Sequence, residues 1–150
     1  MGGPGHDEPL GASDPLALPA TVPAGDAGLL AAIVVGGMAG TLVRLLLSEL
    51  APHDAGRWPW ATLVANVAGA TLLGFVLVRF SSRAPAPSRA RALLGTGFCG
   101  GLTTFSTLQR ELLEMLDIGR GALAVAYVAV SLVAGLAGVL AAVRLTKRPE

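Results

Sequence analysis

Four apolar stretches, each long enough to cross a membrane, dominate the sequence. A helix needs roughly 20 mostly apolar residues to span the hydrocarbon core of a bilayer. Only 14% of the residues are charged, whereas a soluble domain typically carries about 25%. Short connections separate the stretches. The sequence therefore predicts an all-α membrane protein with four transmembrane helices, at about residues 28–50, 60–80, 92–115 and 121–143.

The two ends of the chain differ from this apolar core. Residues 1–27 hold five of the ten prolines and four acidic residues, but no Lys or Arg. Such a segment buries too little apolar surface to order itself, so we expect a disordered N-terminal tail. Residues 28–145 then form a four-helix transmembrane domain, and residues 146–150 form a C-terminal tail.

The composition argues against several functional classes. The net charge of +1 gives no reason to expect a nucleic acid as partner. Cys99 is the single cysteine, and the two histidines, His6 and His53, fall in the tail and in a loop. These residues cannot supply an intramolecular disulfide or a metal-ligand cluster. We therefore expect that the protein is not an enzyme.

Basic residues at the ends of the spans predict the orientation. An even number of spans places both termini on the same side of the membrane. Seven basic residues flank the side of the termini, namely Arg79, Arg83, Arg89, Arg91, Arg144, Lys147 and Arg148. The other side has two, Arg57 and Arg120, or three if Arg110 lies near it. Because cytoplasmic loops carry the excess of Lys and Arg, this distribution favours both termini in the cytoplasm.

Each span also carries two small residues four positions apart, a spacing that lets helix backbones approach closely. The pairs are Gly36 and Gly40, Ala65 and Gly69, Gly97 and Gly101, and Ala134 and Gly138. They predict tight helix packing, but the sequence leaves open whether the partner helix belongs to the same chain or to another.

The third span contains the octet GGLTTFST at residues 100–107. Backbone at membrane depth must be hydrogen-bonded internally, unless it is buried in protein or lines a cavity. A break in the helix at this octet frees carbonyls from one half-helix and N–H groups from the other, which makes a mid-membrane ion site. The alternative is a continuous helix whose hydroxyls bond back to their own preceding turn.

Other polar side chains fall inside the expected spans. Thr62 lies one turn before Asn66 on the second span, and Tyr127 and Ser131 share a face of the fourth by their spacing. With the hydroxyls of Thr103, Thr104, Ser106 and Thr107 they predict a polar track that replaces water around a passing ion. Each of them is equally compatible with a structural hydrogen bond.

Two charged residues lie within or near the ends of the spans. Charges inside a membrane are candidates for functional sites. Arg44, on the first span, could snorkel to the interface or pair with Glu49, and we favour a structural or electrostatic role. Glu111 has the same ambiguity, at the point where the third span is expected to near water.

Three motifs together resemble the CrcB/Fluc fluoride channels. They are GGMAGTLVR on the first span, TLVANVAGATLLGF on the second and GTGFCGGLTTFSTLQRE on the third. The resemblance covers roughly residues 30–140 and includes the order of all four spans. It implies a channel subunit of the prokaryotic plasma membrane that crosses the lipid several times. Such a channel exports toxic cytoplasmic fluoride by passive electrodiffusion.

The resemblance also implies an assembly and a set of site residues. The subunit pairs antiparallel with a second copy or a close homologue, and its third helix breaks in mid-membrane. A structural Na⁺ lies at the dimer interface on the backbone carbonyls of Gly100 and Thr103. Arg44 and Glu111 match positions of electrostatic or structural importance. The fluoride pathway is lined by Asn66, Phe105, Thr62, Ser106, Thr107, Tyr127 and Ser131.

The chain departs from the family pattern at one residue and in one property. Leu108 stands where the family commonly has a second phenylalanine, and leucine has no polarised ring edge to offer an anion. The uneven distribution of arginines also conflicts with a subunit that inserts in both orientations. Both departures fit one half of a heterodimer, paired with an oppositely oriented homologue.

Two other functions are compatible with a chain of this size. A proton-coupled exporter of the small multidrug type needs an ionisable carboxylate deep in a span, and Glu49 and Glu111 both lie toward span ends. A non-conducting partner subunit explains the small-residue pairs, but it leaves Asn66 and Phe105 without a purpose.

Overall fold

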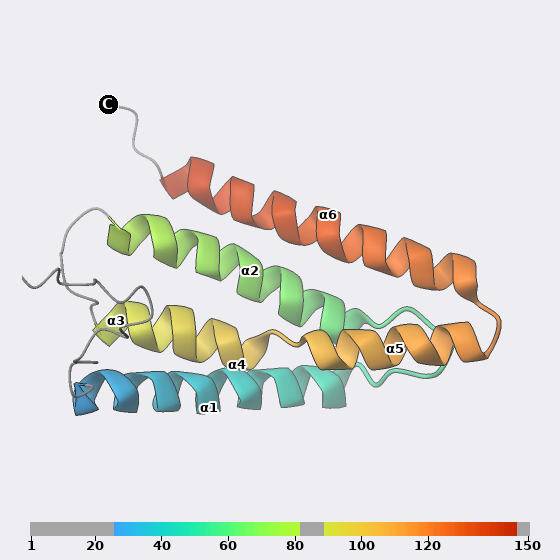
Figure 1. Ribbon diagram of the computed structural model, residues 1–150, viewed down its shortest axis with the longest axis horizontal. Coiled ribbons are helices and arrows are strands. Elements are labelled where there is room, and N and C mark those ends of the chain that lie inside the picture. Colours follow the sequence, from blue (N-terminus) through green and yellow to red (C-terminus); the bar gives the residue numbers. More distant parts are fainter. Residues whose placement is uncertain (1–25, 82–88, 147–150) are drawn as a thin grey trace, which may run out of the picture.

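The computed structural model describes residues 26–81 and 89–146, and every regular element in these two ranges is a helix. Most of the expected N-terminal tail, and residues 147–150 of the C-terminal tail, lie outside the described residues. Figure 1 shows the elements in order, which are α1 (Ala27–Leu50), α2 (Trp60–Ser81), α3 (Arg89–Arg91), the π-helix η1 (Ala92–Cys99), α4 (Gly100–Leu102), α5 (Phe105–Asp117) and α6 (Gly121–Thr146).

Three of these helices are long and apolar enough to cross a membrane. They are α1 with 24 residues, α2, of which Trp60–Phe80 qualifies, and α6 with 26 residues. They cover three of the four spans expected from the sequence. The remaining expected span, 92–115, is divided among η1, α4 and α5, which have 8, 3 and 13 residues.

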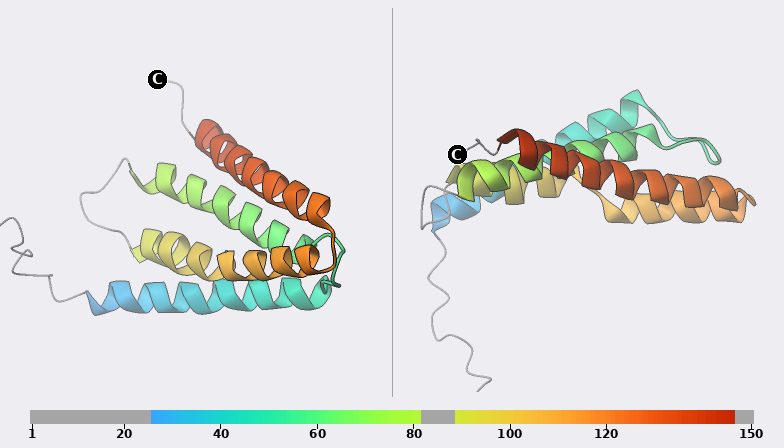
Figure 2. Two further views of the ribbon diagram at one scale, coloured as in Figure 1. Left: turned by 45° about the vertical axis from the view of Figure 1, so that its right-hand side comes forward. Right: turned by 90° about the horizontal axis from the view of Figure 1, so that it is seen from above.

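The helices lie side by side in a shallow layer. In Figure 1, α1 lies next to the row formed by α3, η1 and α4, α2 follows, and α6 forms the far edge. Seen from above in Figure 2, the layer is twisted, because the end of α1 and the helix α5 diverge to opposite sides. The start of α1 and the end of α6 lie at the same end of the layer. This arrangement fits an up-and-down bundle whose two broad faces remain open.

Glycine pairs hold α1 against η1 and α4. A Cβ added to Gly36 would approach the Phe98 nitrogen to 2.9 Å, and one added to Gly97 would lie 2.6 Å from the Ile33 carbonyl oxygen. Gly40 and Gly101 make equally close backbone approaches across the same interface. The partner for these two pairs, which the sequence left open, is therefore the same chain.

Local signals explain where the helices begin and turn. The Asp26 side chain accepts a 2.9 Å hydrogen bond from the Gly28 nitrogen and caps α1. Gly56 and Gly119 adopt φ values of +82° and +75°, which favour glycine, in the connections that precede α2 and α6. These two connections lie at the same end of the layer, beside α5.

Candidate functional site

Two extended residues separate α4 from α5. Thr103 has φ −77° and ψ 152°, and Thr104 has φ −148° and ψ 123°. Both lie in the β region of backbone conformations, so α4 ends at Leu102 and α5 begins at Phe105. The octet singled out from the sequence contains this interruption.

Asn66 of α2 pairs with the backbone of Thr104. Its Oδ1 accepts a 2.7 Å hydrogen bond from the Thr104 nitrogen, and its Nδ2 donates a 3.0 Å hydrogen bond to the Thr104 carbonyl oxygen. One amide side chain thus satisfies both backbone polar groups of an extended residue. The sequence placed Asn66 in the pathway of an ion, and it gave no sign of this pairing.

A cluster of hydroxyls caps the start of α5. The Thr104 Oγ1 accepts a 3.2 Å hydrogen bond from the Thr107 nitrogen. The same oxygen lies 3.0 Å from Thr107 Oγ1 and 3.3 Å from Ser106 Oγ. Phe105, the first residue of α5, is 71% exposed, and the first turn contains no acidic residue. The helix N-terminus therefore presents hydroxyls and an aromatic ring without a negative charge.

Two carbonyls, one at the end of η1 and one in α4, have donors within the chain. The Cys99 carbonyl accepts 3.0 Å hydrogen bonds from both the nitrogen and the Oγ1 of Thr103. The Gly101 carbonyl accepts a 3.2 Å hydrogen bond from Arg44 Nε of α1. Arg44 therefore reaches toward the interruption. This contact involves neither snorkelling nor Glu49, and it is compatible with the structural or electrostatic role favoured from the sequence.

A buried carboxylate lies beyond the start of α5. Glu111 is 2% exposed, and Thr62 and Tyr127 are 4% and 0% exposed. Thr62 Oγ1 donates a 2.6 Å hydrogen bond to Glu111 Oε1, and the Tyr127 hydroxyl donates a 2.9 Å hydrogen bond to Oε2. Glu111 is buried because α2 and α6 cover it. The sequence had instead predicted a position where the span nears water.

This triad predicts a measurable loss of stability when its carboxylate is removed. Glu111→Leu leaves the Thr62 and Tyr127 hydroxyls buried without their acceptor, which costs about 1–3 kcal/mol for each group. We expect the free energy of unfolding in detergent to fall accordingly. Glu49→Leu, which replaces an exposed carboxylate of α1, is the control. Equal stabilities of the two variants would contradict a structural role for the triad.

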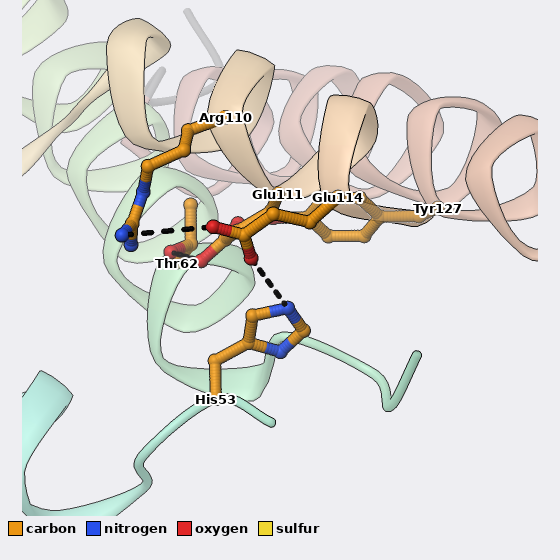
Figure 3. Close-up of polar contacts among 6 residues, drawn as sticks. All are labelled: His53, Thr62, Arg110, Glu111, Glu114 and Tyr127. Atoms are coloured by element: carbon orange, nitrogen blue, oxygen red, sulfur yellow. Dashed lines mark hydrogen bonds and ion pairs between the residues drawn. The ribbon is translucent and has the colours of Figure 1, made fainter. Parts of the chain in front are cut away.

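Residues of the connection between α1 and α2 cover the triad. The Trp58 ring packs edge-on against Tyr127 with a centroid distance of 5.6 Å. His53 Nε2 lies 3.7 Å from Glu114 Oε2, and Arg110 lies 3.7 Å from the other oxygen of the same carboxylate (Figure 3). These neighbours could not be predicted from the sequence, since the connection has no periodic pattern that points to α5.

Two further residues from the sequence analysis take separate places. The Ser131 Oγ is buried and has no hydrogen-bond partner among the described residues. Leu108, which replaces the second phenylalanine of the family, packs against a core cluster that includes Met115 and Tyr127. Its side chain therefore contributes to the core between α5 and α6.

A cavity of about 460 Å³ adjoins the interruption. It lies between α2 and the row of η1 and α4, and its lining includes Gly69, Thr96, Cys99, Gly100 and Thr103. In the described ranges no three His, Cys, Asp or Glu side chains come together as metal ligands.

The site therefore consists of two groups of residues, and Ser131, which lies one turn from Tyr127 on α6, has no hydrogen bond to either group among the described residues. The first surrounds the interruption and contains Asn66, Phe105, Ser106, Thr107, Arg44, Gly100 and Thr103. The second is the buried triad of Thr62, Glu111 and Tyr127. Sequence spacing placed the members of both groups in the same region, and it did not reveal which atoms bond to one another.

Comparison with known proteins assigns the chain to a family. Residues 31–143 match the family described as CrcB-like protein, Camphor Resistance (CrcB). The chain is 49% identical over 119 residues to Fluoride-specific ion channel FluC 1 of Mycolicibacterium paratuberculosis, an alignment that covers 79% of this chain and 90% of the relative. It is 39% identical over 121 residues to Fluoride-specific ion channel FluC of Azotobacter vinelandii, covering 80% and 98%. The chain belongs to the CrcB family.

Proposed function

We propose that this chain is a subunit of a fluoride-selective channel that lets cytoplasmic fluoride leave the cell passively. Relatives that are 49% and 39% identical to it over 119 and 121 aligned residues carry the name fluoride-specific ion channel. The observation that carries the proposal is the start of α5, where the ring of Phe105 is exposed beside the hydroxyls of Thr104, Ser106 and Thr107. A helix N-terminus without an acidic residue favours an anion.

The chemistry of this group suits a small, strongly hydrated anion. Hydroxyls donate hydrogen bonds, whereas an ionised carboxylate only accepts them. The edge of an aromatic ring is positive, so Phe105 meets an anion without the attraction of a full charge. Conduction requires binding weak enough to release the ion. The Ser131 hydroxyl, which has no partner among the described residues, is available as a further donor.

Thr62, Tyr127 and Asn66 have a different place in this pathway. The first two donate their hydroxyl hydrogens to Glu111, and Asn66 is engaged by Thr104. We assign them to the wall of the pathway, where they fix its shape. Glu111 is held between two donors on the far side of that wall, which reduces its repulsion of a passing anion.

The residues present fit a sodium ion on the carbonyls of Gly100 and Thr103. In a continuous helix these carbonyls accept from the nitrogens of Thr104 and Thr107. Here those nitrogens donate to Asn66 Oδ1 and to Thr104 Oγ1, so both carbonyls are released. A hypothetical side chain on Gly100 would meet nothing within 4 Å. A bound Na⁺ supplies a fixed positive charge that lowers the cost of an anion in a low dielectric.

We further propose an antiparallel dimer in the prokaryotic plasma membrane, with the interruption at mid-depth. The open layer leaves large apolar side chains exposed on α1 and α6, among them Met38 at 68% and Leu132 at 68%. Lipid and a second subunit are the environments that cover such surfaces. The partner is a second copy or an oppositely oriented homologue. Equal insertion of this chain in both orientations would argue for the former.

Purified protein in liposomes tests the function. A fluoride electrode should record passive efflux that a proton gradient does not change, and chloride should not leave. If the chain alone is silent, adding an oppositely oriented homologue should restore the flux. If neither preparation conducts fluoride, the chain is a non-conducting partner subunit. Flux that follows the proton gradient would favour the small multidrug-type exporter, and the burial of Glu111 is the observation that supports this alternative.

A further inference from the structure

We propose that the indole N–H of Trp58 is a further hydrogen-bond donor to the transported anion, at the end of the pathway beside the connection between α1 and α2. The inference starts from one atom, because Trp58 Nε1 is buried and has no hydrogen-bond partner among the described residues. It rests on the proposed function and deepens it, since it adds to that pathway a residue which recognises a small inorganic anion.

A buried indole N–H requires an acceptor. The group donates one hydrogen bond and accepts none, and buried polar groups in proteins are nearly always bonded. Leaving the N–H unpaired costs free energy because its hydration is lost without compensation. A donor kept in such a place is therefore suited to an acceptor that arrives from outside the chain.

The ring of Trp58 lies against the wall of the proposed pathway. It packs edge-on against Tyr127, with a centroid distance of 5.6 Å and an interplanar angle of 78°. Tyr127 itself is fully buried and donates its hydroxyl hydrogen to Glu111. Trp58 belongs to the connection that shares one end of the layer with the connection between α5 and α6 (Figure 1). The indole is therefore placed where the pathway reaches that end.

A second donor of the same kind lies deeper along α6. The Ser131 hydroxyl oxygen is also buried without a hydrogen-bond partner among the described residues. Because α6 begins at Gly121, beside the connections, Ser131 lies about 6 Å further from that end than Tyr127 along the helix axis. Trp58 at the end and Ser131 in the interior thus offer an anion two neutral donors in series, and conduction requires several weak sites of this kind.

Neighbouring groups explain why Trp58, and no other residue of its connection, is assigned this role. The nearby Trp60 is 61% exposed, which is typical of an aromatic side chain at the membrane interface. The nitrogens of His53 are buried without hydrogen-bond partners in the described ranges, but Nε2 lies 3.7 Å from a carboxylate oxygen of Glu114. That carboxylate repels an anion, whereas the indole is a neutral donor.

The indole signals of the wild-type protein test the proposal directly. The chain has two tryptophans, so ¹⁵N-tryptophan labelling in detergent gives two indole N–H signals, and Trp58→Phe identifies them by removing one. We expect the Trp58 proton signal to move downfield as NaF is added and then to saturate, because donation to an anion deshields the proton. The Trp60 signal is the internal reference, and NaCl at the same concentration should move neither signal.

Fluoride flux shows whether this donor contributes to conduction. Trp58→Phe keeps an aromatic ring beside Tyr127 but removes the N–H. We expect its flux in liposomes to fall by about threefold to tenfold, which is the effect on a rate of losing one neutral hydrogen bond. Trp60→Phe is the matched control and should conduct like the wild type, and the unfolding midpoints of both variants separate lost conduction from lost protein.

Two results would overturn the inference. A Trp58 signal that does not respond to NaF, in a preparation that conducts fluoride, would show that its N–H does not meet the ion, and the proposed function would stand without it. An equal response to NaCl would show a donor that does not distinguish fluoride from chloride. If the wild type conducts no fluoride, the proposed function fails, and the titration still decides whether Trp58 binds this anion.

Discussion

Replacing Gly97 by valine is expected to prevent the chain from folding. Its Cβ would lie 2.6 Å from the Ile33 carbonyl oxygen and 3.0 Å from Gly36 Cα, and both are backbone atoms that cannot move aside without displacing α1. Overpacking of a filled interface costs about 1–3 kcal/mol and occasionally more, and here the side chain is inserted between two backbones. We expect the variant to elute as an aggregate in size-exclusion chromatography.

Gly135→Val is the matched control for this result. Gly135 also lies in an apolar helix, and a Cβ added there meets nothing within 4 Å. The control should elute like the wild type, with an unfolding midpoint in denaturing detergent that is close to the wild-type value. A Gly97→Val variant with the same elution and midpoint would show that α1 does not pack on η1 as described.

Phe105→Ile is expected to lower fluoride flux in liposomes by about tenfold or more and to leave stability unchanged. Isoleucine keeps the apolar volume but has no positive ring edge, and the loss of ~1.4 kcal/mol at a barrier reduces a rate tenfold. Phe105 is 71% exposed, so its replacement removes little packing.

The control for this variant is another exposed ring. Phe75 of α2 is 44% exposed and lies away from the interruption in sequence, so Phe75→Ile should conduct like the wild type. Flux measured with a fluoride electrode, together with an unfolding midpoint, separates lost conduction from lost protein. Unchanged flux in Phe105→Ile would remove this ring from the pathway.

The sequence predicted the apolar helices well because membrane insertion depends on length and composition, which a window of residues contains. The same holds for the glycine pairs of α1 and the third expected span, since a spacing of four is a local property. The sequence could not show which helix each glycine pair packs against, because Gly36 and Gly97 meet only after the chain has turned twice.

For a related reason, the hydrogen-bond partners within the site could not be predicted from the sequence. Asn66 and Thr104 are 38 residues apart, and Thr62 and Glu111 are 49 apart, so no periodicity links them. Glu111 was expected near water because its position along the span is peripheral. Burial, however, depends on the neighbouring helices, and here α2 and α6 supply two hydroxyls and exclude solvent around it.

The π-helix η1 affects how this part of the gene can change. Its eight residues form a wider coil than an α-helix, with each N–H reaching five residues back instead of four. A π-turn therefore holds more residues than an α-turn, and deletion of one codon, for example that of Thr96, would let the coil tighten into an α-helix while the flanking parts stay close to register. The same deletion within α1 or α6 would rotate the flanking parts by about 100° relative to each other. Loss of a single residue should thus be tolerated better in η1 than in the long α-helices.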